Sequence, residues 1–98
     1  MELTFQYERD RIFAEDGAGR LLAEIRFPAQ EAGVVNFAST FVDPALRGQG
    51  VADALVRAAI ARVRGRGEKA VATCSYARAW FARHPEQADL LAQPPPGD

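Results

Sequence analysis

The chain has 98 residues, of which 48% are hydrophobic and 26% charged, and its formal net charge is -1. These values are typical of one small soluble globular domain, and they disfavour a general nucleic-acid binder, which normally carries an excess of basic residues. No apolar run is long enough to span a bilayer, and Met1-Glu2-Leu3 does not begin a signal peptide. We therefore expect a cytoplasmic protein with neither a membrane nor a nucleic-acid partner.

Cysteine and histidine each occur once, as Cys74 and His84. A single cysteine can form no internal disulfide and no cysteine-based metal cluster. No carboxylate pair is spaced to share a helix face with His84. We therefore expect no bound metal.

The first third of the chain reads as a three-stranded antiparallel meander. Residues 3–8 alternate apolar and polar side chains, which is typical of a half-buried strand. A second strand covers 11–15, and the turn signal Asp16-Gly17-Ala18-Gly19 separates it from a third strand at 20–27.

A fourth, longer strand is expected from Val34 to Val42. Pro28 ends the third strand, and residues 30–33 turn the chain back. The sheet is expected to be antiparallel up to this point.

The segment from Asp43 to Gly50 is a short loop between that strand and a long helix. From Val51 to Arg64, apolar residues recur at i, i+3 and i+4, which predicts a helix with one buried stripe. Gly65 ends this helix.

The last part of the chain adds one strand and one helix. The strand at 69–73 follows the fourth strand through a helical crossover, so the two should be parallel. Ser75 is a suitable N-cap for a helix that ends at His84, before Pro85. We therefore expect one α/β domain, 1–92, with a mixed sheet in the order β-β-β-β-α-β-α, followed by a frayed tail, 93–98.

The loop before the long helix has the features of an anion site. The first N–H groups of a helix lack intrahelical partners, and Gly48 and Gly50 allow a ligand to approach the main chain. The loop lacks a lysine after Gly50, and Asp53 stands where a dinucleotide fingerprint has its third glycine. A phosphate site is therefore indicated, but neither a nucleotide triphosphatase nor a dinucleotide site.

Two motifs in the chain resemble those of a known superfamily. Arg47-Gly48-Gln49-Gly50-Val51-Ala52 resembles the [QR]-x-x-G-x-[GA] loop of the GNAT acyltransferase superfamily. The segment from Cys74 to Glu86, with Cys-x-Tyr and His-Pro-Glu, resembles a short single-domain GNAT-like subfamily. The likeness covers roughly residues 36–91, and the first three strands agree only in pattern.

The resemblance implies binding of acetyl-CoA. The backbone N–H groups from Gly48 to Ala52 would hold the pyrophosphate, with Arg47 adding charge. The pantetheine arm would lie between the fourth and fifth strands, and the thioester would point toward Cys74. The coenzyme-binding residues implied in this way are Phe41, Val42, Arg47, Gly48, Gln49, Gly50, Val51 and Ala52.

Cys74 is the candidate nucleophile. It precedes a predicted helix, whose N-terminal dipole favours the thiolate, and a thiolate could carry the acyl group in a ping-pong transfer. The alternative is a small buried packing residue, the usual role of a lone cysteine. Tyr76 is the candidate acid that protonates the departing CoA thiolate, although its i, i+4 spacing to Trp80 is also typical of core residues.

One departure from the family pattern concerns the general base. Relatives with these motifs tend to carry His-Thr before the loop, where this chain has Ser39-Thr40. His84 lies one helix later, where a histidine more often complements the helix dipole. The sequence therefore identifies no base.

Three functions remain open. The first is an acetyl-CoA-dependent N-acyltransferase acting on an unidentified amine through acyl-Cys74. The second is a non-catalytic acyl-CoA-binding or sensing module, and the third is an interaction domain whose glycine loop is only a turn. A second subunit or another protein could complete the acceptor side.

Overall fold

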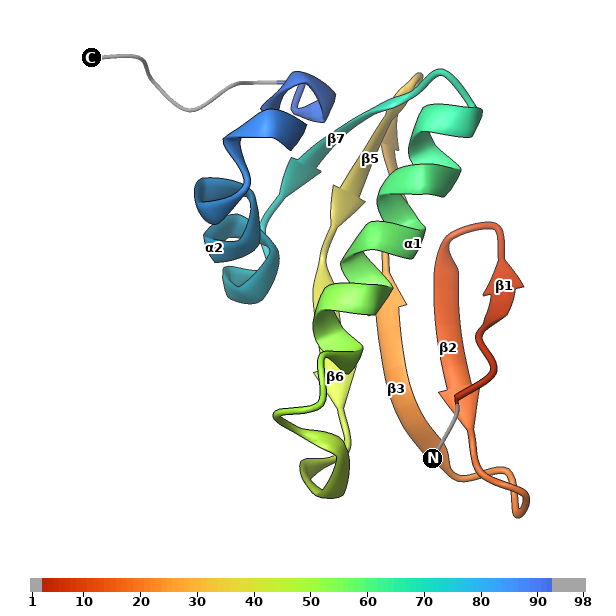
Figure 1. The fold of residues 1–98 in the computed structure, drawn as a ribbon. Coiled ribbons are helices and arrows are strands. Elements are labelled where there is room, and N and C mark those ends of the chain that lie inside the picture. The colour runs from red at the N-terminus through yellow and green to blue at the C-terminus, as the bar shows by residue number, and fades with distance from the viewer. Residues whose placement is uncertain (1–2, 93–98) are drawn as a thin grey trace.

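The computed structural model describes residues 3–92, so the predicted tail, 93–98, lies outside the described residues. Figure 1 shows a sheet crossed by one long helix, with a shorter helix beside its last strand. The strands are β1 (Gln6–Glu8), β2 (Arg11–Glu15), β3 (Leu21–Arg26), β4 (Ala29–Glu31), β5 (Val34–Phe37), β6 (Ser39–Val42) and β7 (Lys69–Ala72). The helices are α1 (Val51–Gly65) and α2 (Ser75–Arg83), with 3-10 helices at Pro44–Leu46 and Pro85–Leu90.

The predicted meander is present, but its first strand covers only Gln6–Glu8 rather than 3–8, and all of its residues are exposed rather than half-buried. Strands β1, β2, β3 and β6 form an antiparallel sheet in that order. Ile12 pairs with Ile25 and Ala14 with Ala23, and all four side chains are fully buried. Because alternate residues of a strand share a face, this register directs one apolar face toward α1, which contacts β2, β3 and β6.

The single strand predicted from Val34 to Val42 is wrong. The chain forms β5 and β6, interrupted at Ala38, and β4 precedes them where only a turn was expected. A shift in register accounts for the interruption, because the chain from Val35 to Ser39 has one residue more than the chain from Arg26 to Ala29 that it faces. β6 therefore continues alongside β3, whereas β5 pairs with β4 and β7 in a second sheet.

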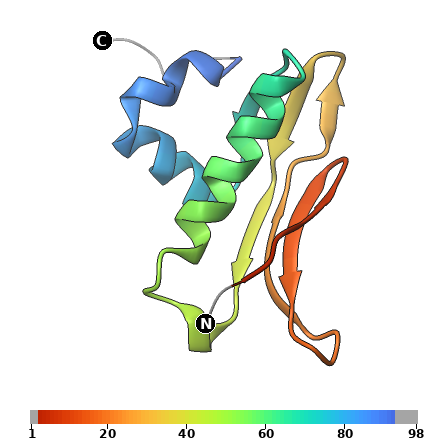
Figure 2. The same cartoon turned by 45° about the vertical axis from the view of Figure 1, so that its right-hand side comes forward.

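The predicted parallel pairing across α1 is confirmed for the first part of the predicted fourth strand, which is β5. β5 and β7 pair in parallel from Val34↔Lys69 to Phe37↔Ala72. β6 has no ladder with β7 among the described residues, so the two strands separate beyond Phe37. Figure 2 shows α1 lying across this region, with α2 next to it.

Aromatic packing fixes α2 against the rest of the fold. Phe81 lies 5.8 Å from Phe37 and 5.4 Å from Trp80 between ring centroids, and Phe37 meets Phe27 edge to face at 6.0 Å. All four rings are buried. They belong to the same core as the stripe of α1, which comprises Leu55, Val56, Ala59, Ile60 and Val63. Neither described helix is long and apolar enough to cross a membrane.

Candidate functional site

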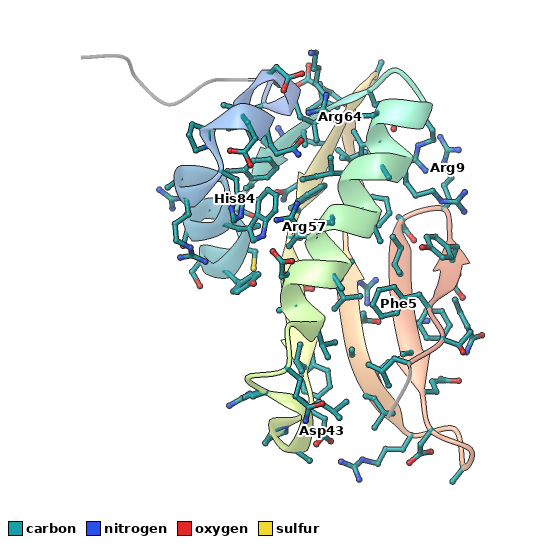
Figure 3. All side chains as sticks on the ribbon, in the orientation of Figure 1. Phe5, Arg9, Asp43, Arg57, Arg64 and His84 are labelled. Atoms are coloured by element: carbon teal, nitrogen blue, oxygen red, sulfur yellow. The ribbon has the colours of Figure 1, made fainter. Side chains whose placement is uncertain are left out.

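The loop that leads into α1 is anchored by a buried carboxylate. Asp43 Oδ1 accepts the N–H of Ala45 at 2.9 Å and caps the 3-10 helix Pro44–Leu46, while its other oxygen accepts from the Arg20 guanidinium. The Ala45 N–H lowers the pKa of Asp43, burial opposes this effect, and Arg20 adds to the lowering. Figure 3 shows Asp43 at the end of the molecule where α1 begins.

The glycines of the loop adopt a backbone conformation that other residues rarely take. Gly48 has φ 81° and Gly50 has φ 78°, and Gly50 is the N-cap residue of α1. Among residues 3–92, no side chain caps this helix by a hydrogen bond. No atom lies within 4 Å of a Cβ built at either glycine. The N-terminus of α1 is therefore open to a ligand and electrically positive.

A cavity of about 420 Å³ begins at this helix end and extends along β6 to α2. Seven of the predicted site residues line it, namely Val42, Arg47, Gly48, Gly50, Val51, Ala52 and Tyr76. Thr40, Leu46 and Asp53 complete the lining. The structure thus brings together residues from the loop, β6, α1 and α2.

Phe41 and Gln49 are not among the residues that line this cavity. Successive strand residues point to opposite faces, so Phe41 lies on the other face from Thr40 and Val42 and is 41% exposed. Gln49 Nε2 donates to the Ala45 carbonyl at 3.4 Å, which keeps its side chain on its own loop.

Cys74 lies just outside the cavity lining and contacts it through Thr40. Its thiol donates to Thr40 Oγ1 at 3.6 Å, and the side chain is partly buried. Cys74, rather than the predicted Ser75, is the N-cap residue of α2, because the extended backbone ends at Cys74 and Ser75 is already helical. The Arg78 N–H accordingly bonds to the Cys74 carbonyl at 2.9 Å.

The N-terminus of α2 stabilises the Cys74 thiolate. Burial raises the pKa of the thiol, but the backbone N–H groups of Ala77 and Tyr76 at the start of α2 and the Thr40 hydroxyl lower it by more. The net pKa lies below the ordinary value, as expected for a cysteine at a helix N-terminus.

Tyr76 stays protonated over a wider pH range than an ordinary tyrosine. Burial raises the pKa of its phenol, the negative charge of Asp53 raises it further, and Arg83 opposes them. A protonated phenol on the cavity wall is a competent proton donor.

Asp53 is a site residue that the sequence analysis did not identify as a binding or catalytic residue. It forms an i, i+4 ion pair with Arg57 at 2.9 Å, and it also accepts the indole N–H of Trp80 at 2.7 Å. Both contacts lower the pKa of Asp53, and the hydrogen bond from Trp80 has the larger effect. Figure 3 shows Arg57 extending from α1 toward α2, the helix that ends at His84.

His84 is held at the C-terminal end of α2. Its Nδ1 lies 2.7 Å from the Trp80 carbonyl, and its ring stacks on the Trp80 ring at 3.8 Å between centroids. It is not among the residues lining the cavity, and Ser39 is exposed on β6. In the described part of the chain, no three His, Cys, Asp or Glu residues cluster so as to hold a metal ion.

Residues 11–90 match the family described as GCN5-related N-acetyl-transferase. No curated protein matches the sequence at a significant level. The family match covers both the glycine loop and the segment that contains Cys74 and Tyr76.

Solved structures share the fold. A GCN5-like protein from Staphylococcus aureus, solved by NMR, is 26% identical with a TM-score of 0.77, over 91% of this chain and 87% of that one. A GNAT family N-acetyltransferase from Escherichia coli in complex with CoA is 24% identical with a TM-score of 0.61, over 74% of this chain and 43% of that one. A GNAT family acetyltransferase from Brucella melitensis in complex with acetyl-CoA is 28% identical with a TM-score of 0.55, over 71% and 50%. The chain thus spans most of the first protein and half or less of the two coenzyme-bound ones.

Proposed function

The chain belongs to the GCN5-related N-acetyltransferase family, and we propose that it transfers the acyl group of acetyl-CoA to an amine through Cys74. The observation that carries this proposal is the cavity between the uncapped N-terminus of α1 and the Thr40–Cys74 pair. A cavity with an anion site in its lining and a thiolate beside its Thr40 wall suits a coenzyme with a pyrophosphate at one end and a thioester at the other.

The residues around the loop fit the pyrophosphate of the coenzyme. The open space above Gly48 and Gly50 admits a phosphate close to the main chain, where the N–H groups of Val51 and Ala52 can donate to it. Arg47 lines the cavity and has no ion pair within residues 3–92, so its guanidinium is available to a phosphate oxygen.

The proposed reaction has two steps. The Cys74 thiolate attacks the thioester carbonyl, forms a new carbon–sulfur bond and displaces the CoA thiolate, which takes a proton from Tyr76. A neutral amine then attacks the acyl-Cys74 carbonyl, releases the thiolate of Cys74 and loses its extra proton to Tyr76, which returns to its starting form. Each acyl group thus moves once to the enzyme and once to the amine.

The second candidate function is binding of acyl-CoA without transfer. It is favoured by Ser39, which stands where relatives tend to carry a histidine, and by the position of His84 outside the cavity lining. In this case Cys74 would be a packing residue, and the cavity would serve only to recognise the coenzyme.

Release of CoA thiol from acetyl-CoA in the presence of a panel of primary amines distinguishes the two functions. The transferase proposal predicts amine-dependent release by the wild type and loss of that release in Cys74→Ala. Cys74→Ala should still bind acetyl-CoA in a calorimetric titration, because it leaves the glycine loop intact. Binding by the wild type without release for any amine would favour the binding module.

The acceptor side is proposed to be completed by a second subunit or another protein. Light scattering with and without acetyl-CoA would detect self-association. A monomer in both conditions would exclude the second copy as the completing partner.

A further inference from the structure

Asp53 joins the two helices that border the cavity. One carboxylate oxygen accepts the indole N–H of Trp80 on α2 at 2.7 Å, and the other accepts Arg57 Nε on α1 at 2.9 Å. Trp80 is only 1% exposed, so its N–H depends on this protein acceptor for a hydrogen bond. The two contacts differ in character, since Arg57 is 52% exposed and its ion pair is open to water.

Both partners of this hydrogen bond lie close to residues that line the cavity. Asp53 is the third residue of α1 and directly follows Val51 and Ala52, which line the anion-binding end. Trp80 lies one helical turn after Tyr76 on the same face of α2, because residues four apart in a helix are neighbours. Tyr76 is the one cavity-lining residue that α2 contributes among those the structure describes.

We propose that Asp53 is a positioning residue, whose hydrogen bond to Trp80 fixes the distance between the anion-binding end of α1 and the Tyr76 wall of the cavity. The proposal rests on the proposed function, because it assigns the fixed space to the pantetheine arm of acetyl-CoA. The affinity for a ligand that occupies only the anion-binding end should therefore not change when this hydrogen bond is removed. The affinity for a ligand that extends past Tyr76 should fall.

Two variants of Asp53 separate its hydrogen bond from its charge. Asp53→Ala removes both, whereas Asp53→Asn removes the charge but keeps an oxygen that can accept the Trp80 N–H. Arg57→Gln is the matched control, because it removes the exposed ion pair and the guanidinium 5.3 Å from the Trp80 ring centroid but leaves the Asp53–Trp80 hydrogen bond in place. Trp80→Phe removes the donor and keeps a ring, and it serves as a second test if Asp53→Ala does not fold.

The experiment measures the affinity of each variant for ADP, which contains a diphosphate but no pantetheine arm, and for acetyl-CoA. Trp80 is the only tryptophan, so its indole N–H gives a single NMR signal whose hydrogen exchange reports on the hydrogen bond directly. Circular dichroism confirms that each variant is folded.

The proposal predicts that Asp53→Ala and Trp80→Phe weaken acetyl-CoA binding relative to ADP binding by about tenfold, the scale of one lost hydrogen bond. Asp53→Asn should retain the ratio to within about threefold, and Arg57→Gln should leave it unchanged. The indole N–H should be protected from exchange in the wild type and Asp53→Asn, but not in Asp53→Ala.

If Asp53→Ala weakens the binding of ADP and of acetyl-CoA equally, the positioning role would be overturned. It would also be overturned if the indole N–H exchanges freely in this variant while the ratio of the two affinities is unchanged. If the wild type binds ADP and acetyl-CoA with the same affinity, the positioning role alone would be overturned. A wild type that binds neither ligand would overturn the proposed function together with it.

Discussion

Cys74 Sγ and Thr40 Oγ1 lie 3.6 Å apart, and this contact joins the start of α2 to β6 across the region where β6 and β7 separate. Thr40 also lines the cavity, so the thiol lies beside a residue of the cavity wall. The proposed reaction depends on this contact, because Cys74 itself is outside the cavity lining.

The first prediction concerns the pH dependence of Cys74. Because the pKa of the thiol is lowered in the folded protein, alkylation by iodoacetamide should reach half its maximal rate below the pH typical of a free cysteine. Thr40→Val should move this midpoint upward, since it removes a hydroxyl that stabilises the thiolate. Ser39→Ala, on the exposed neighbouring position, is the control and should leave the midpoint unchanged.

The same shift makes stability depend on pH. A pKa that is lower in the folded than in the unfolded state means that the thiolate favours folding above the unfolded pKa, and that this contribution is lost as pH falls through the folded pKa. The loss should therefore occur between the two pKa values. A midpoint of alkylation at or above that of the unfolded chain would contradict the assignment.

The second prediction tests the glycine loop. Gly50→Glu should abolish acetyl-CoA binding in calorimetry, because it places a carboxylate and a side chain at the N-terminus of α1 where the phosphate would bind. Gly33→Glu is the matched control, since Gly33 has the same φ of 78°, equally open surroundings and a carbonyl that bonds to Lys69 beyond the other end of α1. Both variants should lose some stability from the strained backbone, but Gly33→Glu should keep its affinity. Retained binding by Gly50→Glu would exclude this loop as the anion site.

The third prediction tests the anchor of the loop. Asp43→Ala removes the cap of the 3-10 helix and the partner of Arg20, so the loop should open more often. Limited trypsin digestion should then cut after Arg47 faster than in the wild type, and acetyl-CoA should slow the cut in both. Asp89→Ala is the control, because it removes one negative charge and the partner of Arg64 away from the loop. An unchanged cleavage rate in Asp43→Ala would show that the loop is held by other contacts.

The fourth prediction concerns the packing of α2. Phe81→Ala should lower the free energy of unfolding by about 3–5 kcal/mol, because the ring is buried against Phe37 and Trp80. Arg78→Ala on the same helix is exposed and should change the free energy by less than about 0.5 kcal/mol. Urea denaturation followed by Trp80 fluorescence measures both. Similar midpoints for the two variants would show that α2 is not part of the cooperative core.

Local patterns in the sequence predict most of the fold. The spacing of the apolar residues predicts the bounds of β2, β3 and α1 closely. The helical crossover predicts the parallel pairing of β5 with β7. The break at Ala38 was missed, because it arises from one extra residue between the pairs Arg26↔Ser39 and Ala29↔Val35. Such an interruption depends on register, which the alternation of Val34 to Val42 does not encode.

The site was predicted where its residues belong to motifs of the family, and it was missed where residues enter only through tertiary contacts. The loop motif gives Arg47, Gly48 and Gly50, whereas Thr40 and Asp53 enter through tertiary contacts with Cys74 and Trp80. The two-residue period of a strand could have shown that Val42 shares its face with Thr40 rather than with Phe41. No local signal pairs Asp53 with Trp80, which lies 27 residues later.

Intact mass after incubation with acetyl-CoA, recorded for the wild type and for Cys74→Ala, tests acyl transfer through Cys74 most directly. The account predicts one added acetyl group on the wild type, removed by hydroxylamine as a thioester would be, and none on Cys74→Ala. Trapping should be efficient without an amine, because the second step then has no acceptor. A wild type that binds acetyl-CoA and gains no mass, or a Cys74→Ala variant that gains the same mass, would contradict the role of Cys74.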